Sequence, residues 1–181
     1  MRRLIWILVG SLALVACATR PSRPCIQLPR LRLAPAALPA PLALQQHLHF
    51  SYGQQQRDLD ALLEADHSHV QLAVQAMGQM GVRLSWDGRT MKQQRAPWLP
   101  PQVRASRVLE DLQFSLWPLS AVAAVLPAGW SVTDDGRQRR LCHQGRTWLL
   151  LQRESDGSMT LSNFVEGYAL RIESLDLRSR R

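Results

Sequence analysis

This chain of 181 residues has no apolar run long enough to cross a membrane as a helix. The run of apolar or small residues from Leu4 to Ala16 has 13 residues, whereas a spanning helix needs roughly 20. There are three cysteines, and a single lysine, Lys92, stands among 22 basic residues. No nucleophile, base and orienting group occur at a spacing that specifies catalysis. The sequence therefore argues against a helical membrane span and against an enzyme, and it implies no cofactor.

The first 17 residues have the layout of a secretory signal. Arg2 and Arg3 precede the apolar run, and a cysteine follows it. The segment Leu14-Val15-Ala16-Cys17 resembles the lipobox, in which signal peptidase cuts before an acylated cysteine. Each buried methylene of an acyl chain adds about 0.8 kcal/mol of membrane affinity, so several chains hold a protein firmly. We expect cleavage after Ala16 and lipidation of Cys17, and the alternative is an unmodified cysteine.

The predicted mature chain has 165 residues, enough for one domain. Residues 1–16 contain two basic and no acidic residues, so the net charge falls from +8 to about +6. Residue 18 is Ala, not the Asp that favours retention at the inner membrane, which points to the periplasmic face of the outer membrane. Export makes a nucleic-acid partner implausible. Arginines near the anchor can instead contact anionic lipid head groups.

Residues 17–41 contain six of the eleven prolines and lack a regular apolar period. This composition predicts a semi-rigid tether of about 3.1 Å per residue. The folded domain is then expected over residues 42–177, folding without the tether, with a basic tail at 178–181. Cys25 lies in the tether and Cys142 in the domain. In the oxidising periplasm they form either a disulfide or two free thiols.

Alternating apolar and polar residues from Leu42 onward predict β-strands joined by short turns. The pattern covers residues 42–51, 59–65, 70–76 and 82–86, and it returns at 130–133, 138–143, 147–152, 159–165 and 168–174. Between them, Val108, Leu109, Leu112 and Leu116 have helical spacing, and a second helical pattern precedes Pro127. We expect an α+β fold, in which a curved antiparallel sheet of eight to ten strands is covered on its concave face by two short helices.

The order of these parts resembles the outer-membrane lipoprotein receptor LolB, its periplasmic carrier relative LolA and, above all, the DUF3261 family of LolB-like lipoproteins. The resemblance rests on Met77-Gly78-Gln79-Met80-Gly81-Val82-Arg83-Leu84-Ser85-Trp86-Asp87-Gly88, on Trp98-Leu99-Pro100-Pro101 and on Leu109-Glu110-Asp111-Leu112-Gln113-Phe114-Ser115-Leu116-Trp117-Pro118. It implies an incomplete β-barrel. Trp98 and Leu99 form either an apolar tip or part of the core.

The resemblance also implies a function. It suggests that the protein binds or receives a hydrophobic acylated cargo, either a lipoprotein or a lipid or polyene, in exchange with a periplasmic carrier. The alternative is a non-catalytic accessory subunit of a lipid or aryl polyene assembly, whose interior is filled by its own side chains. The residues expected to line a cargo cavity are apolar and lie on the predicted inner faces: Leu72, Val74, Leu84, Trp86, Leu112, Leu116 and Trp117.

Polar residues offer weaker leads. His47 and His49, and likewise His67 and His69, are two residues apart, so each pair points to one side of a strand, as metal ligands do. Because both pairs lie in the polar register, we expect solvated histidines and no metal, unless the two pairs converge. Asp111 and Gln113 either orient a polar head group or make ordinary core hydrogen bonds.

Overall fold

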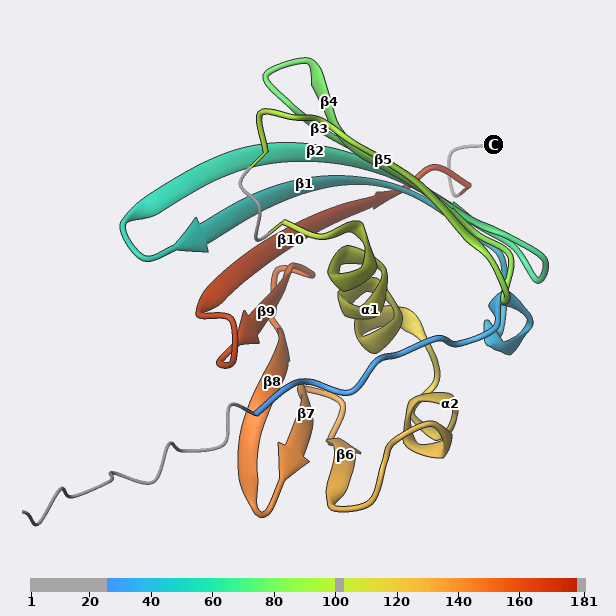
Figure 1. Cartoon of the computed structure of the whole chain (residues 1–181), viewed down its shortest axis with the longest axis vertical. Helices are drawn as coiled ribbons and strands as arrows, with labels where there is room; N and C mark the ends of the chain where they lie inside the picture. Colours follow the sequence, from blue (N-terminus) through green and yellow to red (C-terminus); the bar gives the residue numbers. More distant parts are fainter. Residues whose placement is uncertain (1–25, 100–102, 179–181) are drawn as a thin grey trace, which may run out of the picture.

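The computed structural model describes residues 26–99 and 103–178, which form ten strands, two α-helices and one short 3-10 helix. All the strands belong to one antiparallel sheet in the order β5-β4-β3-β2-β1-β10-β9-β8-β7-β6 (Figure 1). In chain order the strands are β1 (Leu42–Tyr52), β2 (Gln55–Ala65), β3 (Val70–Ala76), β4 (Gln79–Trp86), β5 (Met91–Arg95), β6 (Trp130–Asp134), β7 (Gln138–His143), β8 (Arg146–Arg153), β9 (Met159–Asn163) and β10 (Tyr168–Asp176).

The sheet is open, with β5 and β6 at its two edges. It is neither closed nor strongly curled, so the structure supports the expected antiparallel sheet and helices without the barrel-like closure. Within β1–β5 and within β6–β10, consecutive strands pair through short turns, and β1 pairs with β10 to join the two halves. At the β3–β4 turn both Met77 and Gly78 have positive φ, 49° and 73°, as a two-residue hairpin turn of the preferred twist requires.

Both helices lie on one face of the sheet (Figure 1). Helix α1 (Ala105–Leu116) contacts β4 and β5, and helix α2 (Leu119–Ala124) contacts β6. The core lies between α1 and the sheet and includes Leu63, Leu84, Leu109 and Phe114, each at most 2% exposed. None of the described helices is long and apolar enough to span a membrane.

The buried guanidinium of Arg139 on β7 holds the C-terminal end of α1. It donates to the carbonyl oxygens of Phe114 and Trp117 at 2.7 and 2.8 Å, and its Nε donates to Asp134 at 2.7 Å. The last carbonyls of a helix have no partner within the helix, and a cation there also faces the negative end of the helix dipole. Arg139 therefore joins α1 to the β6–β8 half of the sheet.

Strand β5 is absent from the sequence-based prediction. Its residues Met91-Lys92-Gln93-Gln94-Arg95 are largely exposed, since it is an edge strand. An edge strand without an apolar face shows no alternation of apolar and polar residues, so periodicity could not reveal it. The remaining strands and both helices begin and end within a few residues of their predicted positions, which confirms those predictions.

The segment expected to be a tether is part of the fold over its described length. We name residues 27–38 the N-terminal strap. The strap crosses the helical side of the sheet as an extended chain and ends in the 3-10 helix η1 (Pro35–Ala37) (Figure 1). Leu31, Leu33 and Leu38 are at most 3% exposed and belong to the core. The core therefore includes residues that precede Leu42. The first residue of the predicted basic tail also contacts the fold, because Arg178 Nη1 donates a hydrogen bond to the carbonyl oxygen of Pro41 at 2.5 Å.

Candidate functional site

Strands β3 and β4 bring the sheet residues of the predicted cavity together. Leu72 pairs with Leu84, and Val70 pairs with Trp86, so their side chains lie on the same face. Leu72, Leu84 and Trp86 are between 2% and 4% exposed, and Val74 is half-buried at the edge of the same cluster. The alternation in the sequence thus placed these four residues on the side of the sheet that faces α1.

The helical residues of the predicted cavity are less deeply placed. Leu112 and Leu116 are partly buried and pack against the core, whereas Trp117 is fully buried. The most deeply buried side of α1 carries Leu109, Gln113 and Phe114 instead. Apolar residues spaced three and four apart predict a helix, but the elements packed against that helix determine which of its faces is most deeply buried. Here α1 is buried from more than one side.

Gln113 is the polar centre of this region. It is fully buried on α1, and its side-chain amide bonds both backbone groups of Leu33 in the strap. Gln113 Oε1 accepts from the Leu33 N–H at 3.2 Å, and Gln113 Nε2 donates to the Leu33 carbonyl at 2.9 Å. This is the pairing that a neighbouring strand would offer. The strap is therefore held through its backbone here, in addition to the burial of its leucine side chains.

Two tryptophans add to this recognition. The indole N–H of Trp86 donates to the same Leu33 carbonyl at 2.8 Å, and that of Trp117 donates to the carbonyl of Ala34 at 3.0 Å. Buried indole N–H groups need such partners. Together with Gln113 they form what we call the strap clamp. Sequence reasoning missed it, although the alternation of Leu31 and Leu33 with Arg30 and Arg32 was a usable signal.

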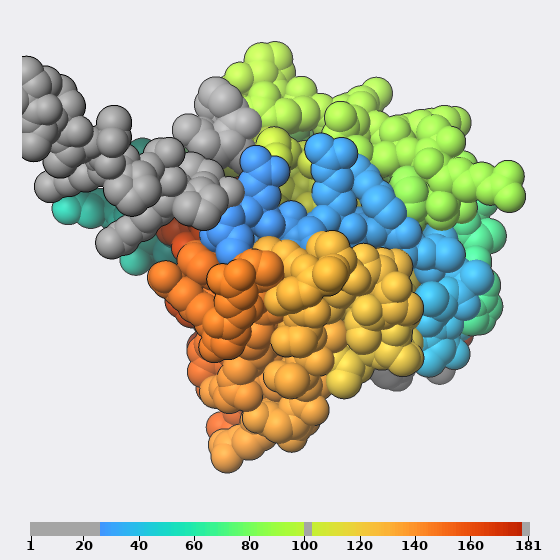
Figure 2. Space-filling view, turned by 60° about the horizontal axis from the view of Figure 1, so that its bottom comes forward, coloured from blue at the N-terminus to red at the C-terminus, as the bar shows by residue number. Residues whose placement is uncertain are grey.

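The strap fills the groove in which it lies. Figure 2 shows it as a blue band between the strands near β4 and the surface formed by α2 and β6–β8. Two hollows of about 590 and 620 Å³ open elsewhere on the surface. The first lies on β2–β5 beside Glu64 and Arg83, and the second lies near Leu42 and Leu177. The lining of the first hollow includes Leu72 and Leu84 of the predicted cavity, but neither hollow is lined by α1 or by the strap.

A buried ionic cluster lies along α1. Arg107 is 3.0 Å from Glu110 and 3.2 Å from Asp111, and all three residues are at most 8% exposed. The hydroxyl of Tyr168 on β10 donates to Asp111. Burial raises the pKa of Asp111 to about 6, against the lowering effect of the Arg107 guanidinium. Burial and the Asp111 carboxylate also raise the pKa of Tyr168. The cluster joins α1 to β10, so Asp111 makes internal bonds in this structure.

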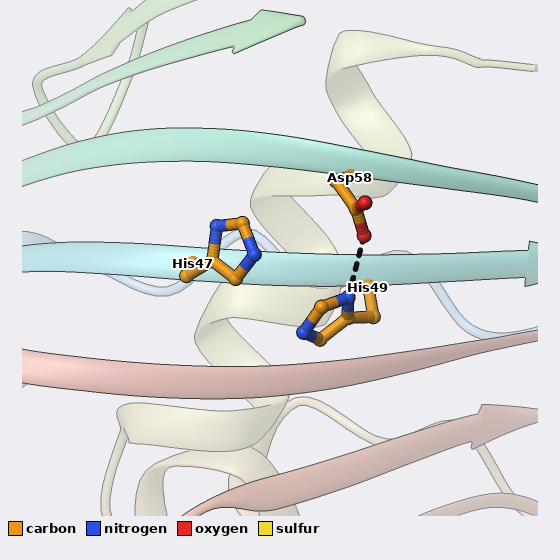
Figure 3. Close-up of side chains that lie close together, drawn as sticks. All are labelled: His47, His49 and Asp58. Atoms are coloured by element: carbon orange, nitrogen blue, oxygen red, sulfur yellow. Dashed lines mark hydrogen bonds and ion pairs between the residues drawn. The ribbon is translucent and has the colours of Figure 1, made fainter.

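The two histidine pairs do not converge. His47 and His49 lie on the outer face of β1 beside Asp58 of β2 (Figure 3). His67 and His69 lie at the β2–β3 turn, where His69 Nδ1 is 2.9 Å from Ser68 Oγ. The metal-dependent enzyme that required both pairs to meet therefore has no support in this arrangement.

Other predicted residues are placed as follows. Trp98 is 47% exposed, and Leu99 packs against the core, so this segment divides between the two expected roles. Cys142 has no disulfide partner among the described residues. Cys17, Cys25 and the predicted signal peptide lie outside the described residues.

Comparison with known protein families gives a match over most of the described chain. A family model described as "Protein of unknown function (DUF3261)" matches residues 43–176. None of the curated proteins with which the chain was compared matches it. The three clamp residues lie within the matched region, whereas the strap precedes it.

Proposed function

The chain belongs to the DUF3261 family, and on that premise we propose that it is a LolB-like lipoprotein of the outer membrane that binds a hydrophobic acylated cargo. The cargo, an acyl chain of a lipoprotein, lipid or polyene, would occupy the apolar groove that the strap fills beside α1 and β4. A periplasmic carrier would deliver it or collect it. The protein would act as a binding and transfer module without catalysis.

The observation that carries this proposal is the strap clamp. Trp86, Gln113 and Trp117 hold an extended segment through its backbone, and Leu33 of that segment is buried in the apolar groove. A site of this kind accepts an extended apolar ligand with a polar group near its middle, such as an ester or amide. Because the strap occupies it, cargo would bind by displacing the strap. Each buried methylene of an acyl chain would contribute about 0.8 kcal/mol.

The strap also changes the expected relation to the membrane. A tether reaching residue 41 would hold the domain up to about 75 Å from Cys17. With the fold beginning near Ile26, the nine intervening peptide units extend at most about 30 Å. A lipid on Cys17 would therefore keep the domain next to the bilayer and pull directly on the strap. Such a linkage would suit a site that opens at the membrane.

A second function is favoured by the packing of the interior. Leu72, Leu84 and Trp117 are at most 4% exposed and already fill the space between α1 and the sheet. A protein that keeps this interior closed would be an accessory subunit of a lipid or aryl polyene assembly and would present only its surface to a partner. The two functions differ in whether the strap ever leaves its groove.

Binding of a fluorescent fatty acid separates the two. In a carrier, Leu33→Ala should weaken the strap by about 2–5 kcal/mol, and the probe should bind at least about 10-fold more tightly than to the unaltered protein. Arg30→Ala, an exposed change in the same segment, should leave the affinity unchanged. If all three proteins are folded and none binds the probe at micromolar concentrations, the accessory function is favoured.

A further inference from the structure

The outer face of β1 carries a cluster that the proposed function does not use. His47 and His49 flank the buried Leu48, so both side chains point away from the core. The register places Asp60 opposite His47 and Asp58 opposite His49 on β2. On the other side, β10 places Glu173 opposite His47. Two imidazoles and three carboxylates therefore meet on the three central strands.

The distances suit a metal ion. One ligand atom from each of His47, His49 and Asp58 lies within 4.8 Å of the other two. Ligands on a tetrahedral ion with bonds of about 2.0–2.1 Å are about 3.4 Å apart, so small rotations of these side chains suffice. The His49 Nδ1 to Asp58 Oδ1 hydrogen bond of 2.5 Å would open to admit the ion. Side-chain exposures of 43–72% leave room for that movement.

His47 also has a carboxylate partner for its other ring nitrogen, whereas Glu173 lies beyond hydrogen-bond distance of the other ring nitrogen of His49. Nδ1 of His47 is 3.1 Å from Asp60, which leaves Nε2 as the ligand, and Figure 3 shows a ring nitrogen of His47 turned toward His49. Nε2 of His49 is 4.0 Å from Glu173. Histidines that bind metals almost always have such a partner, which fixes the ring orientation and increases the basicity of the ligating nitrogen.

The local charge favours a cation. Among the described residues, Asp58 and Asp60 form ion pairs with histidines only, although the whole chain has a formal charge of +8. Arg171, the nearby cation, is paired with Asp156 and Glu173 at 2.9 and 3.2 Å. Two imidazoles with one carboxylate select Zn²⁺, Cu²⁺ or Ni²⁺, whereas Ca²⁺ and Mg²⁺ prefer sites made of oxygen ligands.

We infer that His47, His49 and Asp58 form a binding site for a divalent transition-metal ion on the outer face of the sheet. Asp60 acts as a positioning residue that orients the imidazole of His47. Three protein ligands leave a further coordination position for water or for a ligand from outside. The site is independent of the apolar groove, because its side chains lie on the opposite face of the sheet.

Zinc titration by calorimetry tests this inference on the full chain, purified without a polyhistidine tag. We expect one Zn²⁺ per chain. His47→Gln/His49→Gln should abolish binding at this site, and Asp58→Asn and Asp60→Asn should each weaken it at least about 10-fold. The matched control is His67→Gln/His69→Gln, which removes the same two side chains elsewhere, keeps every thiol and should bind zinc like the unaltered protein.

Two results would overturn the site. One is the absence of zinc or copper binding at high-micromolar metal concentrations. The other is equal loss of binding in the two double variants, which would indicate diffuse binding to surface histidines. The circular dichroism spectra of all variants should be the same, because the substituted side chains are exposed. Equal spectra would show that a loss of binding does not arise from unfolding.

Discussion

The structural role of the strap is tested by replacing Leu33 with Ala. The Leu33 side chain is 3% exposed and packs in the core, and its backbone is held by Gln113 and Trp86. Truncating a buried leucine costs about 2–5 kcal/mol, through lost burial and the cavity left behind. With a urea dependence of about 2 kcal/mol per molar for a domain of this size, the unfolding midpoint should fall by about 1–2 M.

The sequence supplies a control three residues away. Arg30 is exposed, so Arg30→Ala should change the free energy of unfolding by no more than about 0.5 kcal/mol. A chain that begins at Leu42 should be less stable than one that begins at Gln27, because it lacks Leu31, Leu33 and Leu38. Urea unfolding followed by tryptophan fluorescence measures all of these. Equal midpoints for Leu33→Ala and Arg30→Ala would show that the strap does not belong to the core.

Three further predictions concern other parts of the molecule. Asp111 has a pKa of about 6 against an ordinary value of 3.8, so its ionisation should lower stability by about 3 kcal/mol as the pH rises from about 3 to 7. Denaturant unfolding at both pH values should show this loss, and Asp111→Asn should remove it. Arg139→Met should cost about 1–3 kcal/mol by leaving the buried carbonyls of Phe114 and Trp117 at the end of α1 without a donor, since Asp134 keeps its pair with Arg153, and the same unfolding assay measures it. Cys17→Ser should release the protein from the outer-membrane fraction, as fractionation after an alkaline wash would show.

The sequence alone determined the positions of most strands and both helices. Period-two alternation in segments such as Val70–Ala76 depends only on one face of a strand being buried, so it appears without knowledge of the partner strand. The short turn at Gly78 sets the pairing of Ala76 with Gln79, but the pairing of Leu72 with Leu84 also depends on a one-residue shift of register between Val74 and Gln75, which the alternation does not reveal. Local patterns of this kind also identified the predicted signal peptide and the family resemblance.

Only the tertiary structure showed that the strap is buried against α1 and β4. The prolines of residues 29–41 predict an extended backbone. The local conformation of an extended chain is the same whether the chain is exposed to solvent or buried, so the prolines do not reveal which of the two applies. What buries Leu31 and Leu33 is contact with Gln113 and Trp86, which are 80 and 53 residues from Leu33. The histidine site has the same origin. His47 and His49 share a face by their spacing, but Asp58 and Glu173 reach them only because β1 lies between β2 and β10, and that order is a property of the whole sheet.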